Sequence, residues 1–117
     1  MSGLASVIIP NWNGAALLPA CLDSLRAQTY PDVEIVVVDN ASTDDSVDLL
    51  RRRYPEARLV LLDTNRGLTG GVNAGIAAAR GDAILLLNND AEADPNWVAA
   101  LAGALDDYPA AGSIASK

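Results

Sequence analysis

The chain has 117 residues, half of them hydrophobic, which is enough for one compact domain with a modest core. A net charge of −7 without an extended basic stretch argues against nucleic acid and against an anionic membrane surface as partners. The chain lacks histidine, which excludes imidazole-dependent catalytic triads, and its single cysteine, Cys21, cannot form an internal disulfide. No stretch has the roughly 18 apolar residues of a membrane span. We expect a cytoplasmic protein, peripheral to a membrane at most in its full-length form.

Four short apolar runs, rich in Val, Ile and Leu, predict strands that are buried on both faces. They span residues 4–10, 33–38, 57–62 and 82–87. The last letters, SIASK, predict the start of a fifth strand. Segments with helical spacing separate the runs. This alternation predicts an α/β fold, in which helices flank a mostly parallel sheet with right-handed crossovers.

Four helices are predicted after these strands. The third, at about residues 69–80, is rich in Gly and Ala, which lets a helix approach its neighbour closely. We expect Ser42 or Thr43 to cap the second helix, and Pro95 to take the first position of the fourth helix after a cap at Asp94. The apolar stripes of the other three are Leu18, Cys21, Leu22 and Leu25, then Val47, Leu50 and Tyr54, then Trp97, Val98, Leu101 and Leu105. Cys21 is interpreted as a small buried hydrophobe, and Trp97 as the anchor of the last helix.

Polar residues follow each of the four predicted strands. The sequences at these points are PNWNG, DNASTDD, DTNRGLTGG and NNDAEADP. One such end is ordinary turn chemistry. Because ligands bind beyond the carboxyl ends of parallel strands, four polar ends at the same edge predict a binding site.

The sequence at this edge carries neither of the common phosphate-binding fingerprints. GGVNAGIA, residues 70–77, lacks the Lys and hydroxyl of a P-loop, and PNWNG is not the G-x-G-x-x-G of a dinucleotide site. NND, residues 88–90, offers Asp90 as a hard oxygen donor for magnesium or manganese, together with substrate phosphates. The same three residues are also typical of a plain turn.

The aspartates near this edge divide between binding and structural interpretations. Asp39 either is delivered by its strand to a binding site or caps a turn, and Asp63 either borders that site or closes its strand. Asp44, Asp45 and Asp94 are interpreted as helix-start residues. We therefore expect Asp39→Ala to weaken binding of the ligand, a nucleotide if the resemblance given next holds, with little effect on folding, and Asp44→Ala to do the reverse.

Five motifs in order resemble the family 2 glycosyltransferases of the GT-A fold, and within them the rhamnosyltransferase-like members. They are SVIIPNWNG, LDSLRAQTYPDVEIVVVDNASTDDS, NRGLTGGVNAG, ARGDAILLLNND and DPNWV, and they cover essentially the whole chain. The resemblance implies that residues 1–117 are the N-terminal nucleotide-binding, Rossmann-like part of a truncated GT-A domain. It further implies a nucleotide-diphosphate sugar as donor, a divalent metal (Mn or Mg), and inversion of the anomeric centre by a single displacement.

The resemblance also implies the residues that bind the donor. Asp90 is the expected metal ligand, and Asn88 stands where many relatives carry Asp, so we expect weak metal affinity without substrate. Trp12 either flanks the site or packs under the first loop. The nucleotide-binding residues carried over are Pro10 and Asn11 for the nucleoside pocket, Asp39 and Asn40 for base or ribose, Arg66 and Asn73 near ribose and diphosphate, and Asn89.

The family's general base lies in the acceptor half, so it is expected beyond Lys117 and no catalytic residue is assigned here. We expect this chain alone to transfer no sugar. The expected partners are a dTDP, UDP or GDP sugar, a glycan or lipid-linked acceptor, and a second copy through an exposed sheet edge. Two alternatives are a non-catalytic nucleotide-sugar-binding or assembly module and, less favoured because PNWNG carries no cation, a nucleotidyltransferase.

Overall fold

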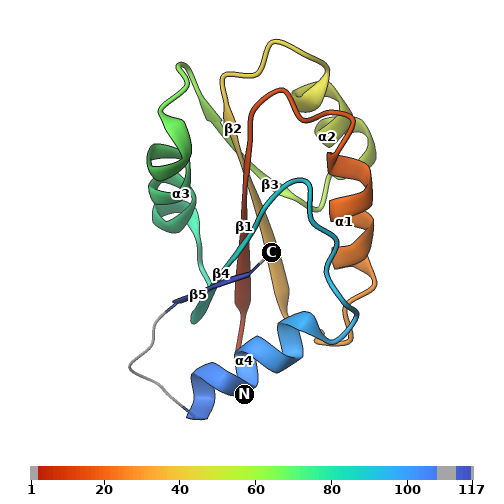
Figure 1. Ribbon diagram of the computed structural model, residues 1–117, viewed down its shortest axis with the longest axis vertical. Coiled ribbons are helices and arrows are strands. Elements are labelled where there is room, and N and C mark those ends of the chain that lie inside the picture. Colours follow the sequence, from red (N-terminus) through yellow and green to blue (C-terminus); the bar gives the residue numbers. More distant parts are fainter. Residues whose placement is uncertain (1–2, 108–112, 117) are drawn as a thin grey trace.

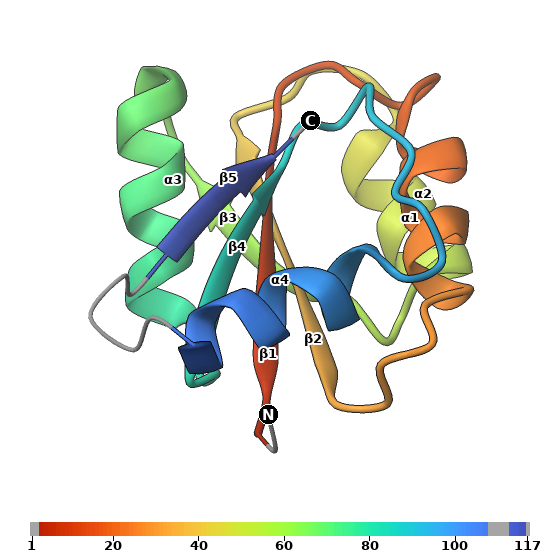
Figure 2. The same ribbon diagram turned by 60° about the horizontal axis from the view of Figure 1, so that its bottom comes forward.

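The computed structural model describes residues 3–107 and 113–116 of the chain, with nine elements (Figures 1 and 2). Five parallel strands form one sheet in the order β3-β2-β1-β4-β5. The strands are β1 (Ala5–Asn11), β2 (Val33–Asn40), β3 (Arg58–Leu62), β4 (Ala83–Leu87) and β5 (Ser113–Ser116). The helices are α1 (Leu18–Arg26), α2 (Ser46–Arg53), α3 (Gly67–Ala78) and α4 (Trp97–Asp107). The predicted α/β fold is confirmed, and the fifth strand forms where SIASK predicts it.

The helices cover the two faces of the sheet unequally. Helix α3 lies alone on one face, whereas α1, α2 and α4 lie on the other (Figures 1 and 2). Two apolar clusters result, a large one under α1, α2 and α4 and a small one under α3. The strands at the centre are buried on both faces, as the continuous apolar runs predict. Cys21 is buried in the large cluster, as expected. None of the described helices is both long and apolar enough to cross a membrane.

Helix α3 lies very close to the sheet, because it presents glycine to it. A Cβ on Gly75 would lie 2.4 Å from Ile8 Cγ2 and 2.9 Å from Val38 Cγ2. A Cβ on Gly71 would lie 2.8 Å from Asn40 Nδ2. Close approach was the predicted consequence of the Gly- and Ala-rich segment, although the helix begins at Gly67, slightly before the predicted residue 69.

The predicted caps of α2 and α4 are wrong. The N-cap of α2 is Asp45, which makes no side-chain cap hydrogen bond. The carboxylate of Asp44 accepts from Ser46 N at 3.0 Å and, with its other oxygen, from Ala15 N at 3.1 Å. The contact with Ser46 N, the first residue of α2, supports the helix-start interpretation of Asp44.

In α4, the helix begins at Trp97, so Pro95 precedes it and does not occupy its first position. Asp94 still begins the turn into the helix, because its carboxylate accepts from Asn96 N at 2.9 Å. Trp97 and Leu101 pack against the large cluster and Val98 is buried within it, which fits the predicted anchor; the side chain of Leu105 lies outside the described residues. In α2 the buried residues are Ser46, Leu49 and Leu50, so Val47 was wrongly placed on the inner face.

A partly buried carboxylate links the strands at the opposite, amino-terminal edge of the sheet. Glu34 Oε1 accepts from Ser6 Oγ at 2.7 Å and from Arg80 N at 2.9 Å, and Arg58 Nη1 lies 3.8 Å from Oε2. Burial alone raises the pKa of Glu34, but the two donors and the charges of Arg58 and Arg80 outweigh it, so the pKa lies below its ordinary value. Glu34 therefore stays ionised well into the acid range.

Candidate functional site: a cavity at the carboxyl edge of the sheet

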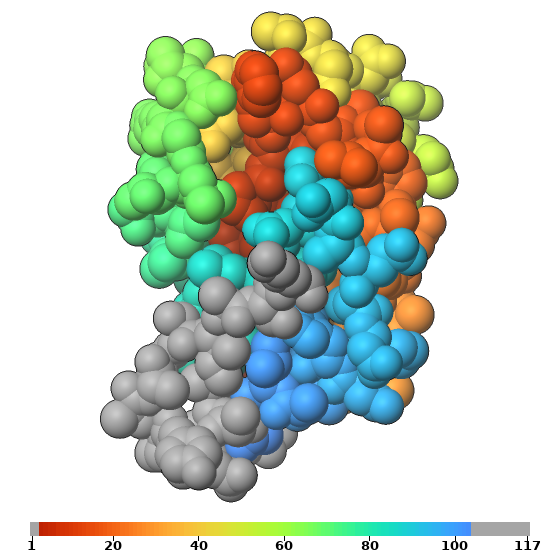
Figure 3. Space-filling view, in the orientation of Figure 1, coloured from red at the N-terminus to blue at the C-terminus, as the bar shows by residue number. Residues whose placement is uncertain are grey.

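A cavity of about 300 Å3 lies at the carboxyl edge of the sheet, between the loop after β1 and the start of α3. Figure 3 shows this region as a hollow between α3 and the segment that follows β1. Two large apolar side chains stand exposed at it, Trp12 at 56% and Leu68 at 67%. The complete lining is Pro10, Asn11, Trp12, Asn40, Asn65, Gly67, Leu68 and Asn89. An exposed aromatic ring beside amide groups suits a ligand with a flat ring and polar edges.

Three polar side chains form a chain of hydrogen bonds across the ends of β1, β2 and β4. Asn11 and Asp39 are register partners on neighbouring strands, and Asn11 Nδ2 donates to Asp39 Oδ1 at 3.1 Å. Asn89 Nδ2 donates to Asn11 Oδ1 at 2.9 Å. The amide of Asn11, 1% exposed, thus joins the end of β2 to the turn after β4. A side chain on Gly14 would collide with both amides, since its Cβ would lie 2.4 Å from Asn11 Oδ1 and 2.3 Å from Asn89 Nδ2.

Asn40 fastens the end of β2 to the start of α3. Its Nδ2 donates to Gly67 O at 3.1 Å, and its Oδ1 accepts from Arg66 N at 3.0 Å. Both polar atoms of the amide are therefore used by the backbone of one loop. This arrangement holds Gly67 and Leu68, two lining residues, at a fixed distance from the sheet.

The loop after β1 and the loop after β2 hold one another through Asn13, a residue that the sequence analysis did not single out. Asn13 Oδ1 accepts from Thr43 N at 2.7 Å and from Asp44 N at 3.2 Å. Asn13 has φ 50° and Ala41 has φ 62°, both in the left-handed region. The signal for Asn13 was its place before Gly14, because Asn tolerates this conformation better than most residues. Ala41 carried no such signal.

The predicted nucleotide-binding residues do not all reach the cavity. Pro10, Asn11, Asn40 and Asn89 line it. Asp39 lies behind it, 2% exposed, with Oδ1 accepting from Asn11 and Ser42 and Oδ2 from Ser42 N at 3.0 Å. The turn-cap interpretation of Asp39 therefore describes its contacts, and its reading of a nucleoside stays a prediction. The expectation that Asp39→Ala leaves folding intact stays a prediction, and the contacts argue against it, because alanine would leave several donors without their buried acceptor.

Arg66, Asn73 and Asp90 are outside the lining of the cavity. Arg66 is exposed, and its Nη2 lies 3.8 Å from Asp63 Oδ1. Neither side chain is part of the cavity wall. Asn73 is exposed on α3. Sequence reasoning missed three lining residues, Asn65, Gly67 and Leu68. All three belong to the DTNRGLTGG end, whose Asn and Gly content was the available signal.

The turn after β4 offers oxygen donors but no complete metal cage. Among the described residues, no three acidic, Cys or His side chains gather closely enough to hold an ion. Asn88 and Asp90 are exposed. Magnesium and manganese are commonly held by one or two carboxylates together with substrate phosphates. The donor set at Asp90 fits an ion shared with a substrate, and does not fit an ion held by the protein alone.

Cys21 approaches the same turn from α1, and its Sγ donates to Asn88 O at 3.6 Å. Burial, with smaller contributions from the negative charges of Asp90 and Glu92, raises the pKa of the Cys21 thiol to about 12. The thiol is therefore protonated and unreactive at neutral pH.

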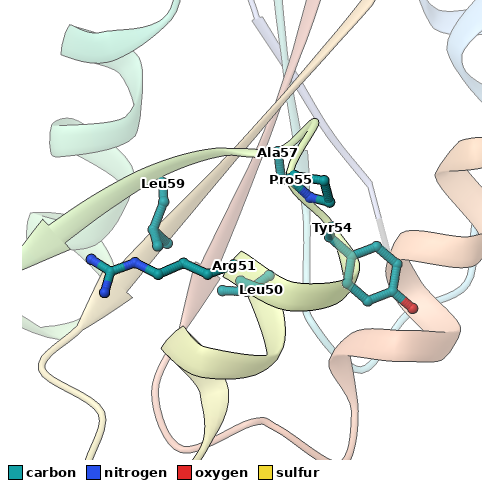
Figure 4. A pocket seen from close by; sticks show the side chains of 6 residues that line it. All are labelled: Leu50, Arg51, Tyr54, Pro55, Ala57 and Leu59. Atoms are coloured by element: carbon teal, nitrogen blue, oxygen red, sulfur yellow. The ribbon is translucent and has the colours of Figure 1, made fainter.

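A second, smaller depression of about 220 Å3 lies between the end of α2 and the start of β3 (Figure 4). Its lining is Leu50, Arg51, Tyr54, Pro55, Ala57 and Leu59. The ring of Tyr54 is covered by Arg26, whose Cζ lies 4.3 Å from the ring centroid, and its hydroxyl donates to Asp23 at 2.9 Å. None of the predicted site residues lies here, so we take the larger cavity as the candidate site.

Comparisons with known proteins agree with the fold. The sequence profile of glycosyl transferase family 2 matches residues 6–117. A "PGL/p-HBAD biosynthesis glycosyltransferase" of Mycobacterium bovis is 42% identical over 88 residues, which are 73% of this chain and 34% of the relative. Glycosyltransferase GlyG of Streptococcus pneumoniae is 31% identical over 104 residues, 86% of this chain and 35% of the relative.

Two solved structures show the same fold. S. aureus TarS 1-349, also solved with UDP and with UDP-GlcNAc, has a TM-score of 0.81 and 26% identity, covering 91% of this chain and 33% of TarS. The mannosyltransferase PcManGT from Pyrobaculum calidifontis, solved with GDP-Man and Mn2+, has a TM-score of 0.71 and 32% identity, covering 79% of this chain and 29% of PcManGT. The chain thus has the GT-A fold of these enzymes and spans about a third of the length of the relatives that it matches. It belongs to glycosyl transferase family 2.

Proposed function

We propose that this chain is the donor-binding part of an inverting, metal-dependent glycosyltransferase, and that its cavity takes the nucleoside of a nucleotide-diphosphate sugar. The observation that carries the proposal is the cavity itself, where the exposed Trp12 and Leu68 stand beside the amides of Asn40, Asn65 and Asn89. Flat apolar surface with amide groups beside it suits a nucleobase and a ribose. TarS and PcManGT, which share the fold, were solved with UDP, UDP-GlcNAc or GDP-Man, which supports this ligand class.

The chain's own residues divide the work of binding. We assign base contact to Trp12 and Leu68, and polar contact with base or ribose to the amides of the lining, Asn89 among them. Asp90, on the turn after β4, would hold a divalent cation, which when bound neutralises diphosphate oxygens. Arg66 and Asn73, exposed on the loop before α3 and on α3 itself, are proposed to approach the diphosphate from outside the cavity.

We propose that the acceptor site and the general base lie in a region corresponding to the part of the relatives that this chain does not span. We therefore expect the 117 residues to bind a donor and to transfer no sugar to an acceptor. A rhamnosyl donor, a glycan or lipid-linked acceptor and a cytoplasmic location stay predictions. Self-association also stays a prediction; the edge strand β3, where Leu61 is 50% exposed, is the surface that we propose for it.

Thermal unfolding with UDP, dTDP and GDP sugars, with and without Mn2+, tests the proposal, because a ligand that binds the folded state raises the melting temperature. We expect at least one nucleotide sugar to stabilise the chain, and Trp12→Ala to weaken its binding by about tenfold. Leu61→Ala is the matched control, since Leu61 is about as exposed but lies outside the cavity. No shift with any donor, or an equal loss in both variants, would contradict the proposed function.

The metal site has its own test. Because Asp90 is the one carboxylate in the NND turn, we expect Mn2+ to bind measurably in calorimetric titrations when the nucleotide is present and weakly when it is not. Asp90→Asn should remove this difference. Tight Mn2+ binding to the free protein would refute the view that the ion is shared with the substrate.

A further inference from the structure

The loop after β1 contains an asparagine followed by glycine, Asn13–Gly14, and no other asparagine in the sequence precedes a glycine. In this pair the side-chain amide is most open to attack by the next backbone nitrogen, because glycine has no Cβ to hinder the approach. Asn13 is exposed, and its Nδ2 makes no hydrogen bond within residues 3–107 and 113–116. The group that would leave in such a reaction is therefore open to water.

The reaction that this pair undergoes is deamidation, and water is its only co-reactant. The Gly14 nitrogen attacks Asn13 Cγ and loses its proton to water, the Cγ–Nδ2 bond breaks, and ammonia leaves. The product is a five-membered succinimide ring. Water then opens the ring at either carbonyl carbon. Opening at Cγ gives aspartate, whereas opening at the original backbone carbonyl gives isoaspartate, in which the main chain runs through Cβ.

The folded backbone turns the two reacting atoms apart. Asn13 has φ 50°, in the left-handed region. This is the region of positive φ that is open to a residue with a side chain, and its ψ of about +47° turns the next nitrogen to the side of Cα away from Cβ. Hydrogen bonds fix both ends of the pair, because Asn13 N donates to Ser42 Oγ at 2.9 Å and Gly14 O accepts from Leu17 N at 2.9 Å.

One feature of the same loop acts in the opposite sense. Asn13 Oδ1 accepts from Thr43 N at 2.7 Å and from Asp44 N at 3.2 Å, and two such donors would stabilise the oxyanion that forms when Cγ is attacked. The same two hydrogen bonds, however, hold the side chain against the loop after β2. Attack requires contact between the reacting atoms, so the geometry outweighs the polarisation of the carbonyl. Conversion therefore requires the two loops to separate first.

We propose that Asn13 is a modification site that deamidates when the loops after β1 and β2 separate, and that the isoaspartate product disables the cavity. Isoaspartate adds one carbon to the main chain between Trp12, which lines the cavity, and Gly14. Gly14 has no room to move, since a Cβ there would lie 2.4 Å from Asn11 Oδ1 and 2.3 Å from Asn89 Nδ2. The extra carbon therefore displaces the cavity wall. The effect on the cavity rests on the proposed function, whereas the modification site does not.

The first measurement compares the folded chain with a free peptide of residues 10–16 during incubation near neutral pH. Mass spectrometry of peptic fragments detects the exchange of NH for O at each asparagine. Three hydrogen bonds hold Asn13 to the neighbouring loop, each worth about a factor of five, so conversion should be about a hundredfold slower in the folded chain. A folded chain that converts as fast as the peptide, or first at another asparagine, would overturn the proposal.

Two matched variants show whether separation of these loops, and not global unfolding, sets the rate. Ser42→Ala removes the acceptor of Asn13 N and should speed conversion by about fivefold. Ser24→Ala is the control, since Ser24 Oγ accepts from Ala93 N at 2.9 Å, away from this loop, and its rate should stay within about twofold of the natural protein. Urea unfolding measures the stability of both variants. Rates that rise in both in proportion to lost stability would show that global unfolding exposes Asn13, and would refute the role of the loops.

The third measurement is titration calorimetry with UDP and Mn2+ on the isoaspartate form, separated from the natural protein by chromatography. Asn13→Asp is its matched control, because it has the same charge and still offers an acceptor to Thr43 N and Asp44 N. We expect affinity within about threefold of natural for Asn13→Asp and about tenfold weaker for isoaspartate. Natural affinity in the isoaspartate form would overturn the effect on the cavity. Failure of the natural protein to bind UDP would overturn that effect and count against the proposed function, whereas the mapping and the serine variants decide the modification site separately.

Discussion

The contact between α3 and the sheet gives a sharp test of how the cavity is held. Gly75→Ala adds a methyl group whose carbon would lie 2.4 Å from Ile8 Cγ2 and 2.9 Å from Val38 Cγ2. Alanine in a helix is favoured over glycine by about 1 kcal/mol. Overpacking a dense core costs about 1–3 kcal/mol. The upper end applies, because both neighbours are buried β-branched residues whose methyl groups cannot turn away.

The net expectation for Gly75→Ala is a loss of about 2 kcal/mol in the free energy of unfolding, or about 8 °C in melting temperature. Gly103→Ala in α4 is the matched control, since a Cβ there meets nothing within 4 Å. The same chemical change should stabilise the chain at Gly103 by about 1 kcal/mol. Urea unfolding followed by circular dichroism measures both.

The effect of Gly75→Ala should extend to the ligand. A displaced α3 carries Gly67 and Leu68 away from the sheet, so affinity for the nucleotide should fall together with stability. Gly103→Ala should leave affinity unchanged. The reasoning fails if Gly75→Ala is as stable as the natural protein, or if both variants shift stability in the same direction.

Three further predictions follow from the contacts described above. Folding lowers the pKa of Glu34, so the stability that its carboxylate contributes is present above about pH 4.3 and is lost as the pH falls through the lower, folded pKa. Glu34→Gln should therefore reduce the loss of stability on going to acid pH, and an unchanged loss would contradict this. Because the pKa of the Cys21 thiol is raised to about 12, the stability of the fold should fall as the pH rises above about 8.5, where the thiol of the unfolded chain ionises. Alkylation of Cys21 at pH 8.5 should be slower by about a thousandfold in the folded protein than in the urea-unfolded chain, and comparable rates would refute the burial of the thiol. Asn40→Asp keeps the acceptor for Arg66 N but turns a carboxylate to Gly67 O, so unfolding should cost about 1–3 kcal/mol less and nucleotide affinity should drop. Asn73→Asp, the same chemical change at an exposed position on α3, should leave the free energy of unfolding nearly unchanged and is the control for stability alone.

The parallel sheet could be predicted from the sequence because one physical rule, the burial of its central strands on both faces, governs it. Strands buried on both faces must be apolar throughout, and four such runs separated by helical spacing leave few arrangements other than a parallel sheet. The helix starts followed less well. The carboxylate of Asp44 accepts hydrogen bonds from Ala15 N as well as from Ser46 N. Ala15 lies 29 positions before Asp44, so the local sequence around the helix start does not reveal this partner.

A cavity lies at the strand ends, where the sequence predicts a site, but its lining was predicted only in part. Topology puts Pro10, Asn11, Asn40 and Asn89 at one edge, so their presence in the cavity wall was predictable. The hydrogen bond between Asn11 and Asp39 depends on the register of two strands, which the sequence does not specify.

Burial separates the residues at this edge of the sheet into two groups. The more buried are Asn11, Asp39 and Asn40, whose amide and carboxylate groups are bonded to other parts of the protein. The exposed ones, Trp12 and Asp90, have their contacting groups open to a ligand. Changes in the buried group should lower stability and affinity together, because the same hydrogen bonds hold the strand ends and the cavity wall. Changes at Trp12 should lower affinity alone. The ratio of the two losses, measured for each variant by urea unfolding and calorimetry, therefore tells a residue that shapes the cavity from one that touches the nucleotide.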